Sequence, residues 1–181
     1  MCMGKQHDID FSGVKSEMLI QGKGLFAHAL RQLAHERQYH PWVLAVTGTN
    51  GKTTVTALTG ALLQRAGLDV DVAGNIGPTL LDTLTQRLDT QLPQAWVLEL
   101  SSFQLNDVSE FEPSAATVLN LTQDHLDYHG NMADYAQAKA KLFAQPGLQH
   151  AVINLDDVFG RELAMNLLAQ DALKVWAYAL N

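Results

Sequence analysis

The stretch from Trp42 to Val55, WVLAVTGTNGKTTV, constrains the fold more than any other part of the chain. Its first residues, 42–46, form an apolar run with two valines, which is typical of a buried strand. A turn with two glycines follows at residues 47–51, and Lys52 opens a periodic apolar segment that we expect to be helical. A strand, a glycine-rich turn and a helix start in this order predict a cradle for phosphate groups.

The chemistry of this cradle comes from backbone and side chain together. The N–H groups of the turn point inward, the helix N-terminus adds partial positive charge, and Lys52 adds a full charge. Thr53 follows the lysine, where a hydroxyl can bind Mg²⁺. The widespread pattern G-x-x-x-x-G-K-[ST] has glycine at the position of Val46, so the match departs at one residue. The alternative is a tight turn between strand and helix with an exposed lysine.

The composition is that of an ordinary globular protein. The 181 residues are enough for one domain with a core, and a net charge of −7 argues against broad binding of nucleic acids or anionic membranes. The single cysteine, Cys2, excludes an internal disulfide framework and a cysteine-based zinc cluster, which fits the reducing cytoplasm. No apolar run approaches the roughly 20 residues that span a bilayer, and the N-terminus lacks the apolar core of a signal peptide.

Helical and strand-like segments alternate along the chain. We expect helices at residues 24–37, 53–66, from Pro78 to 88, 132–144 and 159–169. We expect strands at residues 42–46, 70–72, 95–100, 115–121, 151–154 and 174–178. The alternation implies right-handed crossovers and a mostly parallel α/β sheet with helices on both faces. Residues 1–23 have no clear period, and we interpret them as an N-terminal arm or the remnant of a preceding domain.

Apolar spacing predicts which side of each helix is buried. In the helix at 53–66 the buried side is expected to carry Val55, Leu58, Leu62 and Leu63. Most histidines lie in polar surroundings, and we expect them at the surface. They are His28, His35, His40, His129 and His150.

Polar residues follow the carboxyl ends of the predicted strands, where ligands bind in parallel sheets. They are Lys52, Thr53, Asn75, Glu99, Asp124 and His125. Glu99 stands in the apolar run AWVLEL, where a buried carboxylate is costly without a partner. Glu99 and Thr53 could hold one Mg²⁺ ion between the β- and γ-phosphates of a nucleotide. The alternative for Glu99 is a carboxylate at a strand end that reaches water.

Two further residues have open interpretations. His125 is either a site residue or a loop histidine capped by a neighbouring aspartate, since imidazole is a less usual magnesium ligand than carboxylate. Lys139 shares one helical face with Tyr135, Leu142 and Phe143, so it points along the apolar side. Such a lysine either extends its amine to the surface or has a lowered pKa. A neutral amine can react with CO₂ to give a carbamate, which is a metal-binding carboxylate.

With these residues collected, the chain resembles the central, ATP-binding domain of the Mur ligases, the ATP-dependent amide ligases of peptidoglycan precursor synthesis. The resemblance runs from about Leu25 to the C-terminus. The loop of this family, T-G-T-N-G-K-[ST], lacks the outer glycine, which accounts for Val46. GNIG at 74–77 and ELSSFQL at 99–105 resemble the members that add D-glutamate to UDP-N-acetylmuramoyl-L-alanine. NLTQDHLD at 120–127 and Y-x-x-A-K at 135–139 fit the same family.

The resemblance implies a role for each position. The loop would bind the phosphates of ATP through Gly48, Thr49, Asn50, Gly51, Lys52, Thr53 and Thr54. Thr53 and Glu99 would hold a first Mg²⁺ ion, and His125 and a carbamylated Lys139 a second. The catalytic residues would be Lys52, His125 and Lys139. The UDP-sugar peptide substrate would lie along Asn75, Ser101 and Gln104. The substrate carboxylate would attack the γ-phosphate to give an acyl phosphate, which the amine of D-glutamate would then attack.

Such ligases have three domains and more than twice this length, so residues 24–181 are expected to be a central domain truncated at its C-terminal end. We expect this fragment to keep its nucleotide site, to be a poor ligase alone and to self-associate through exposed domain-interface surface. One alternative is a folylpolyglutamate synthase-like ligase, against which SSFQL argues. Another is a non-catalytic module that binds nucleotide or a partner protein. A generic P-loop kinase or GTPase is a third, and the absence of N-K-x-D weakens its GTPase version.

Overall fold

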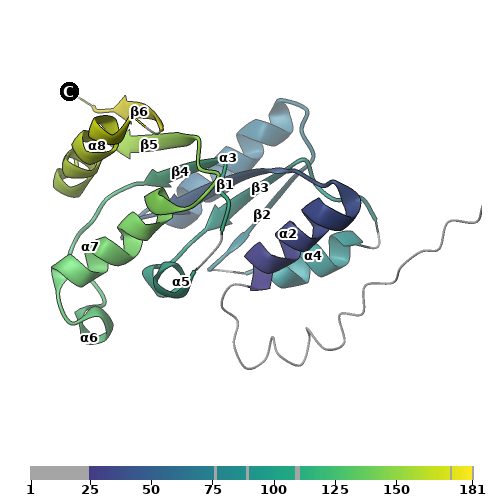
Figure 1. Ribbon diagram of the computed structural model, residues 1–181, viewed down its shortest axis with the longest axis horizontal. Coiled ribbons are helices and arrows are strands. Elements are labelled where there is room, and N and C mark those ends of the chain that lie inside the picture. Colours follow the sequence, from purple (N-terminus) through teal and green to yellow (C-terminus); the bar gives the residue numbers. More distant parts are fainter. Residues whose placement is uncertain (1–24, 76, 89, 109–110, 172, 181) are drawn as a thin grey trace, which may run out of the picture.

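The computed structural model describes residues 25–181 except 76, 89, 109–110, 172 and 181 (Figure 1). Six strands form one sheet in the order β2-β3-β1-β4-β5-β6, and every neighbouring pair is parallel. The strands are β1 (Trp42–Thr47), β2 (Val70–Gly74), β3 (Ala95–Glu99), β4 (Ala115–Val118), β5 (His150–Asn154) and β6 (Lys174–Tyr178). The predicted α/β fold with a mostly parallel sheet is therefore confirmed. The expected N-terminal arm, residues 1–23, lies outside the described residues.

The helices of the described residues follow the strands in alternation. They are α2 (Leu25–Arg37), α3 (Lys52–Arg65), α4 (Leu80–Leu88), α5 (Ser102–Asp107), α6 (Leu126–His129), α7 (Met132–Ala140), the 3₁₀ helix η1 (Lys141–Ala144) and α8 (Val158–Gln170). The predicted helix at 132–144 thus divides into α7 and η1. Pro78 was expected in the first turn of a helix, but it lies before α4, which begins at Leu80. In the first turn of α4, the backbone N–H of Asp82 donates to the Thr79 hydroxyl at 3.2 Å.

The core consists of two clusters, one on each face of the sheet. Alternate residues of β1 divide between them: Val43 and Ala45 belong to the larger cluster, and Val46 to the smaller. The larger cluster contains side chains of α2, α4, α5, η1 and α8, whereas α3 packs against the smaller one. Figure 1 shows α3 behind the strands and α2 in front of them. From β1 to β2 the chain moves across the sheet in one direction, and in all later crossovers it moves in the opposite direction. Because each crossover is right-handed, α3 lies on one face of the sheet and the later helices lie on the other.

The buried side of α3 matches the prediction in part, since Val55 and Leu63 pack against the smaller cluster. The buried residues of α3 are Thr56 and Gly60, whereas Leu58 and Leu62 are 57% and 59% exposed. The reason is a close approach of the helix to the sheet, because a Cβ on Gly60 would lie 2.3 Å from Cγ2 of Val72 in β2. Only small side chains fit at this contact, so the helix turns Leu58 and Leu62 outward.

Two strands, β3 and β4, end earlier than the sequence predicted. The strand predicted at 115–121 ends at Val118, and the strand predicted at 95–100 ends at Glu99. Beyond β4, the backbone N–H of Leu121 donates to the Asp157 carboxylate at 3.1 Å and not to a neighbouring strand. The first residue after each strand still bonds to β1, since the N–H groups of Leu100 and Leu119 donate to the carbonyls of Val46 and Thr47.

Candidate functional site

The carboxyl ends of β1, β2 and β3 surround a cavity of about 270 Å³. Its lining consists of Thr49, Asn50, Gly51, Lys52, Thr53, Thr54, Asn75 and Glu99. Each of these residues was singled out in the sequence as a candidate site residue. The topology explains their meeting, because parallel strands bring their carboxyl ends to one edge of the sheet.

The loop leads directly into α3 and leaves that helix without a side-chain cap. Gly51 is the N-cap residue, with a left-handed φ of 82° that glycine adopts without strain. The first N–H groups of α3 have no partner within the helix and carry its partial positive charge. The Lys52 amine folds back over the loop, where it donates to the carbonyls of Gly48 at 3.0 Å and Thr49 at 2.9 Å. This concentration of positive charge suits a phosphate group.

Glu99 is buried beside this loop. Its side chain is 3% exposed, so the alternative of a carboxylate that reaches water is wrong. One oxygen, Oε2, accepts from the Thr53 hydroxyl at 2.8 Å, while Oε1 is buried and has no partner among the described residues. A buried carboxylate oxygen without a donor is costly. Mg²⁺ takes oxygen ligands of this kind, so the Thr53–Glu99 pair fits a divalent cation.

Lys139 lies under the phosphate loop, on the buried face of α7 that the sequence predicted. Its side chain is 1% exposed, so the alternative in which the amine reaches the surface is wrong. The amine donates to the Gly48 carbonyl at 3.0 Å and the Thr47 hydroxyl at 3.4 Å, and it lies 4.7 Å from the centre of the Tyr135 ring. Burial, assisted by the charge of Lys52, lowers the pKa of Lys139 to about 7. A large fraction of the amine is therefore neutral near pH 7.

His125 lies on the exposed side of the same region. It begins α6 with a left-handed φ of 50°, and its Nε2 is 3.4 Å from the Asp124 carboxylate. The His125 ring packs against Phe103 at 4.9 Å and reaches Tyr135 at 6.4 Å between ring centres. Tyr135 is thus a common neighbour of His125 and Lys139.

Ser101 and Gln104 have a structural role, which the pattern S-x-x-Q at residues 101–104 is typical of. They form a reciprocal cap at the start of α5: the Ser101 hydroxyl accepts from the Gln104 N–H at 3.3 Å, and the Gln104 side chain accepts from the Ser101 N–H at 2.9 Å. Asn75 follows β2 and lines the loop cavity instead. Its backbone N–H donates to the Glu99 carbonyl at 3.0 Å, which brings the two strand ends together.

His129 was expected at the surface, and its side chain is partly buried. Its Nε2 lies 2.9 Å from the Ser102 hydroxyl, and its ring packs against Phe103 at 5.6 Å and Tyr135 at 5.2 Å. Burial and the neighbouring His125 lower its pKa. No periodic pattern identifies such a residue, because the contact joins α6 to α5 across a long stretch of sequence.

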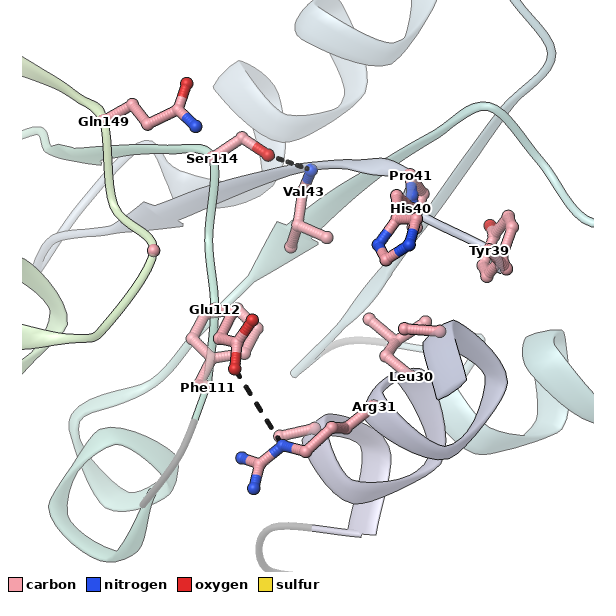
Figure 2. Close-up of a pocket in the computed structure, with 13 residues that line it drawn as sticks. Leu30, Arg31, Tyr39, His40, Pro41, Val43, Phe111, Glu112, Ser114 and Gln149 are labelled. Carbon is pink, nitrogen blue, oxygen red and sulfur yellow. Dashed lines mark hydrogen bonds and ion pairs between the residues drawn. The ribbon is translucent and has the colours of Figure 1, made fainter. Parts of the chain in front are cut away.

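A second cavity, of about 310 Å³, lies at the opposite end of the strands, between α2 and the segments that precede β1, β4 and β5. Figure 2 shows its lining, in which the Val43 N–H donates to the Ser114 hydroxyl at 3.1 Å and Arg31 approaches Glu112 at 3.9 Å. None of the predicted site residues lines it.

Among the described helices, none is long and apolar enough to cross a membrane.

Comparisons with known proteins agree with this geometry. The family model described as "Mur ligase middle domain" matches residues 46–181. The UDP-N-acetylmuramoylalanine–D-glutamate ligase of Albidiferax ferrireducens is 62% identical over 135 residues, which cover 74% of this chain and 26% of the relative. The same-named ligase of Burkholderia cenocepacia is 52% identical over 157 residues, 86% of this chain and 31% of the relative. The chain thus spans less than a third of the length of these curated relatives.

Solved structures share the fold. A UDP-N-acetylmuramoyl-L-alanyl-D-glutamate–2,6-diaminopimelate ligase matches with a TM-score of 0.72 and 32% identity, over 86% of this chain and 36% of the other. The MurF ligase of Thermotoga maritima, solved in complex with ADP, matches with a TM-score of 0.64, 20% identity and the same two coverages. A folylpolyglutamate synthase of Mycobacterium tuberculosis matches with a TM-score of 0.61 and 18% identity, over 91% of this chain and 49% of the other. The last two matches show the fold alone.

Proposed function

The chain belongs to the Mur ligase family, and we propose that it forms the ATP-binding part of a ligase that adds D-glutamate to UDP-N-acetylmuramoyl-L-alanine. The names of relatives at 52% and 62% identity support this choice of substrates over other members of the family. The ELSSFQL segment after β3 supports it over a folylpolyglutamate synthase. The reaction belongs to peptidoglycan precursor synthesis, which we place in the cytoplasm.

The observation that carries the proposal is the joint presence of an anion site and a cation site in one cavity. Lys52 and the uncapped start of α3 supply positive charge, and the buried Glu99 carboxylate supplies negative charge beside it. A phosphate chain with a bound metal ion satisfies both requirements at once. An exposed lysine in a simple turn, the alternative from the sequence, would not explain the unpartnered oxygen of Glu99.

Two magnesium ions are part of the proposal. Thr53 and Glu99 would hold the first, and His125 and Lys139 the second. Lys139 becomes a suitable ligand when its neutral amine attacks CO₂, which forms an N–C bond, releases a proton and leaves a carbamate. Burial and the lowered pKa of Lys139 support this step. When bound, such ions neutralise charge that develops on phosphate oxygens.

The protein's own groups would mainly orient and neutralise the reactants. The substrate carboxylate attacks the γ-phosphorus of ATP and displaces ADP, and the amine of D-glutamate then attacks the acyl carbon and expels phosphate. Lys52 moves from the carbonyls of Gly48 and Thr49 to the phosphate oxygens, where its charge favours the transition state. We propose that Asn75, Ser101 and Gln104 line the path of the UDP-sugar peptide.

Titration of ATP with Mg²⁺ into the chain, followed by calorimetry, tests the site. We expect Lys52→Ala to weaken binding at least tenfold, since it removes a charge-assisted contact worth about 1.5–3 kcal/mol. Lys141→Ala is the matched control, because Lys141 bonds to Asn106 on the surface of α5 and does not line the cavity. Equal binding by the unchanged chain and Lys52→Ala would refute the proposed site.

A further inference from the structure

Asn120 is the second residue after β4, and its side chain bonds to the phosphate loop at three points. Its Oδ1 accepts from the backbone N–H groups of Thr49 at 3.2 Å and Asn50 at 2.9 Å. Its Nδ2 donates to the Asn50 carbonyl at 3.1 Å. β4 pairs with β1, so the residues that follow both strands leave the sheet side by side. One side chain thereby fixes the orientation of three successive peptide units in the loop.

Thr122 extends this attachment. The Thr49 hydroxyl donates to the Thr122 carbonyl at 3.2 Å and accepts from its N–H at 3.0 Å. The Thr49 N–H also has the backbone carbonyl of Asn120 as an acceptor, at 3.0 Å. Residues 49–50 of the loop are therefore bound to a segment about seventy residues away in the sequence.

These bonds divide the N–H groups of the loop into two sets. Those of Thr49 and Asn50 were predicted to face the phosphates, but they already have acceptors within the protein. Those of the first turn of α3, residues 52–54, have no side-chain cap and no partner within the helix. A phosphate that enters the cavity can accept hydrogen bonds from the second set without breaking any bond of the first.

We propose that Asn120 is a positioning residue of the phosphate site: it holds the Thr49 and Asn50 amides turned away from the ligand, so that the amides at the start of α3 bind the phosphates. The role of Asn120 in phosphate binding rests on the proposed function. The attachment of the loop to Asn120 does not depend on it. Asparagine suits the task because its amide supplies an acceptor and a donor in one plane. Alanine supplies neither, and aspartate keeps only the acceptor.

Amide hydrogen exchange, measured by NMR on the ligand-free chain, tests the attachment. In Asn120→Ala we expect the Asn50 amide to exchange about tenfold faster, since the loss of one hydrogen bond costs about 1.4 kcal/mol. Asn120→Asp should return the protection, because its carboxylate still accepts from the Asn50 N–H. Unchanged exchange at Asn50 in Asn120→Ala would overturn the proposal, whether or not the chain binds nucleotide.

Asn154→Ala provides the matched control. Asn154 follows the same strand-end pattern in β5: its Nδ2 donates to the Leu119 carbonyl at 2.9 Å and its Oδ1 accepts from the Asp156 N–H at 2.9 Å. It contacts no residue of the loop through these bonds. We expect Asn154→Ala to leave the exchange of the Asn50 amide unchanged, whereas equal acceleration in both variants would indicate general loosening and overturn the proposal.

Binding of ATP with Mg²⁺, and of magnesium tripolyphosphate as a probe without the nucleoside, tests the consequence for the ligand. We expect Asn120→Ala to bind both probes about tenfold more weakly than Asn154→Ala, with circular dichroism unchanged. Equal affinities of the two variants would overturn the positioning role. The wild-type chain could bind neither probe while Asn120→Ala still accelerates exchange of the Asn50 amide. In that case the proposed function fails and the attachment of the loop to Asn120 stands.

Discussion

Replacement of Lys139 by methionine should stabilise the chain near neutral pH and remove part of its pH dependence. The Lys139 side chain is 1% exposed, and burial lowers its pKa from 10.5 to about 7. A difference of this size corresponds to roughly 5 kcal/mol of destabilisation when the amine is charged in the unfolded chain. Methionine has a similar length and no charge. It also loses the bonds to Gly48 and Thr47, worth roughly 1 kcal/mol each.

The sign of the pH dependence follows from the direction of the shift. Between pH 7 and pH 10.5 the unfolded chain binds the proton that the folded chain releases, so folding stability rises with pH in this window. Below pH 7 both states carry the proton, and the penalty is complete. From pH 7 to pH 9 the wild-type chain should gain roughly 2 kcal/mol that Lys139→Met does not gain. The variant should thus be more stable by roughly 2 kcal/mol at pH 7 and nearly equal at pH 9.

Urea denaturation at pH 7, 8 and 9 in CO₂-free buffer measures this difference, because all other titrating groups are common to both chains. Lys141→Met is the control, since Lys141 donates to Asn106 at the surface. It should show the pH dependence of the wild type. A stability difference between Lys139→Met and wild type that stays constant from pH 7 to 9 would refute the reasoning. Addition of bicarbonate then tests the proposed carbamate, which should stabilise the wild type and leave Lys139→Met unchanged.

Four further substitutions have defined outcomes. Gly74→Ala should destabilise the chain by roughly 3 kcal/mol or more in urea titrations, because its Cβ would lie 2.3 Å from the Glu99 carbonyl and its φ is +152°; a loss below 1 kcal/mol would contradict this contact. Leu62→Gln should change stability by less than about 0.5 kcal/mol, since the Leu62 side chain is 59% exposed. Leu142→Ala should cost about 2–5 kcal/mol, since Leu142 is fully buried. Equal losses of stability in thermal melts of the two variants would support the α3 face that the sequence predicted. Glu99→Gln should reduce the magnesium dependence of ATP binding, which calorimetry at varied Mg²⁺ measures; unchanged dependence would remove Glu99 as a ligand.

The local parts of the fold were predictable because local chemistry determines them. The run from Trp42 to Val46 is apolar and bounded by a glycine-rich turn, and this is enough to identify a buried strand and a helix start. Strand-end polar residues could be collected from the sequence because parallel strands share one edge. The place of Lys139 on the apolar face of its helix also followed from helical spacing, since Tyr135 and Leu142 share that face, whereas the spacing left open whether its amine is buried.

What could not be predicted depends on contacts between distant segments. Leu58 and Leu62 fit an amphipathic helix, but the close contact of Gly60 with Val72 decides which side of α3 faces the sheet. The sequence contained Asn120 within a motif, yet its attachment to the loop exists only because β4 lies beside β1. Strand order is a tertiary property, and the periodicity of one segment does not indicate which strand lies beside it in the sheet.

The direction of the crossovers has a consequence for the durability of the site. α3 leaves β1 toward one face of the sheet, while the helices that follow β2, β3, β4 and β5 lie on the other. β1 is therefore a topological switch point, where neighbouring connections diverge and open a crevice beyond the strand ends. The crevice is a property of strand order, so no side chain has to be removed to create it. Substitutions in the helices can alter stability considerably and still leave an opening at the end of β1.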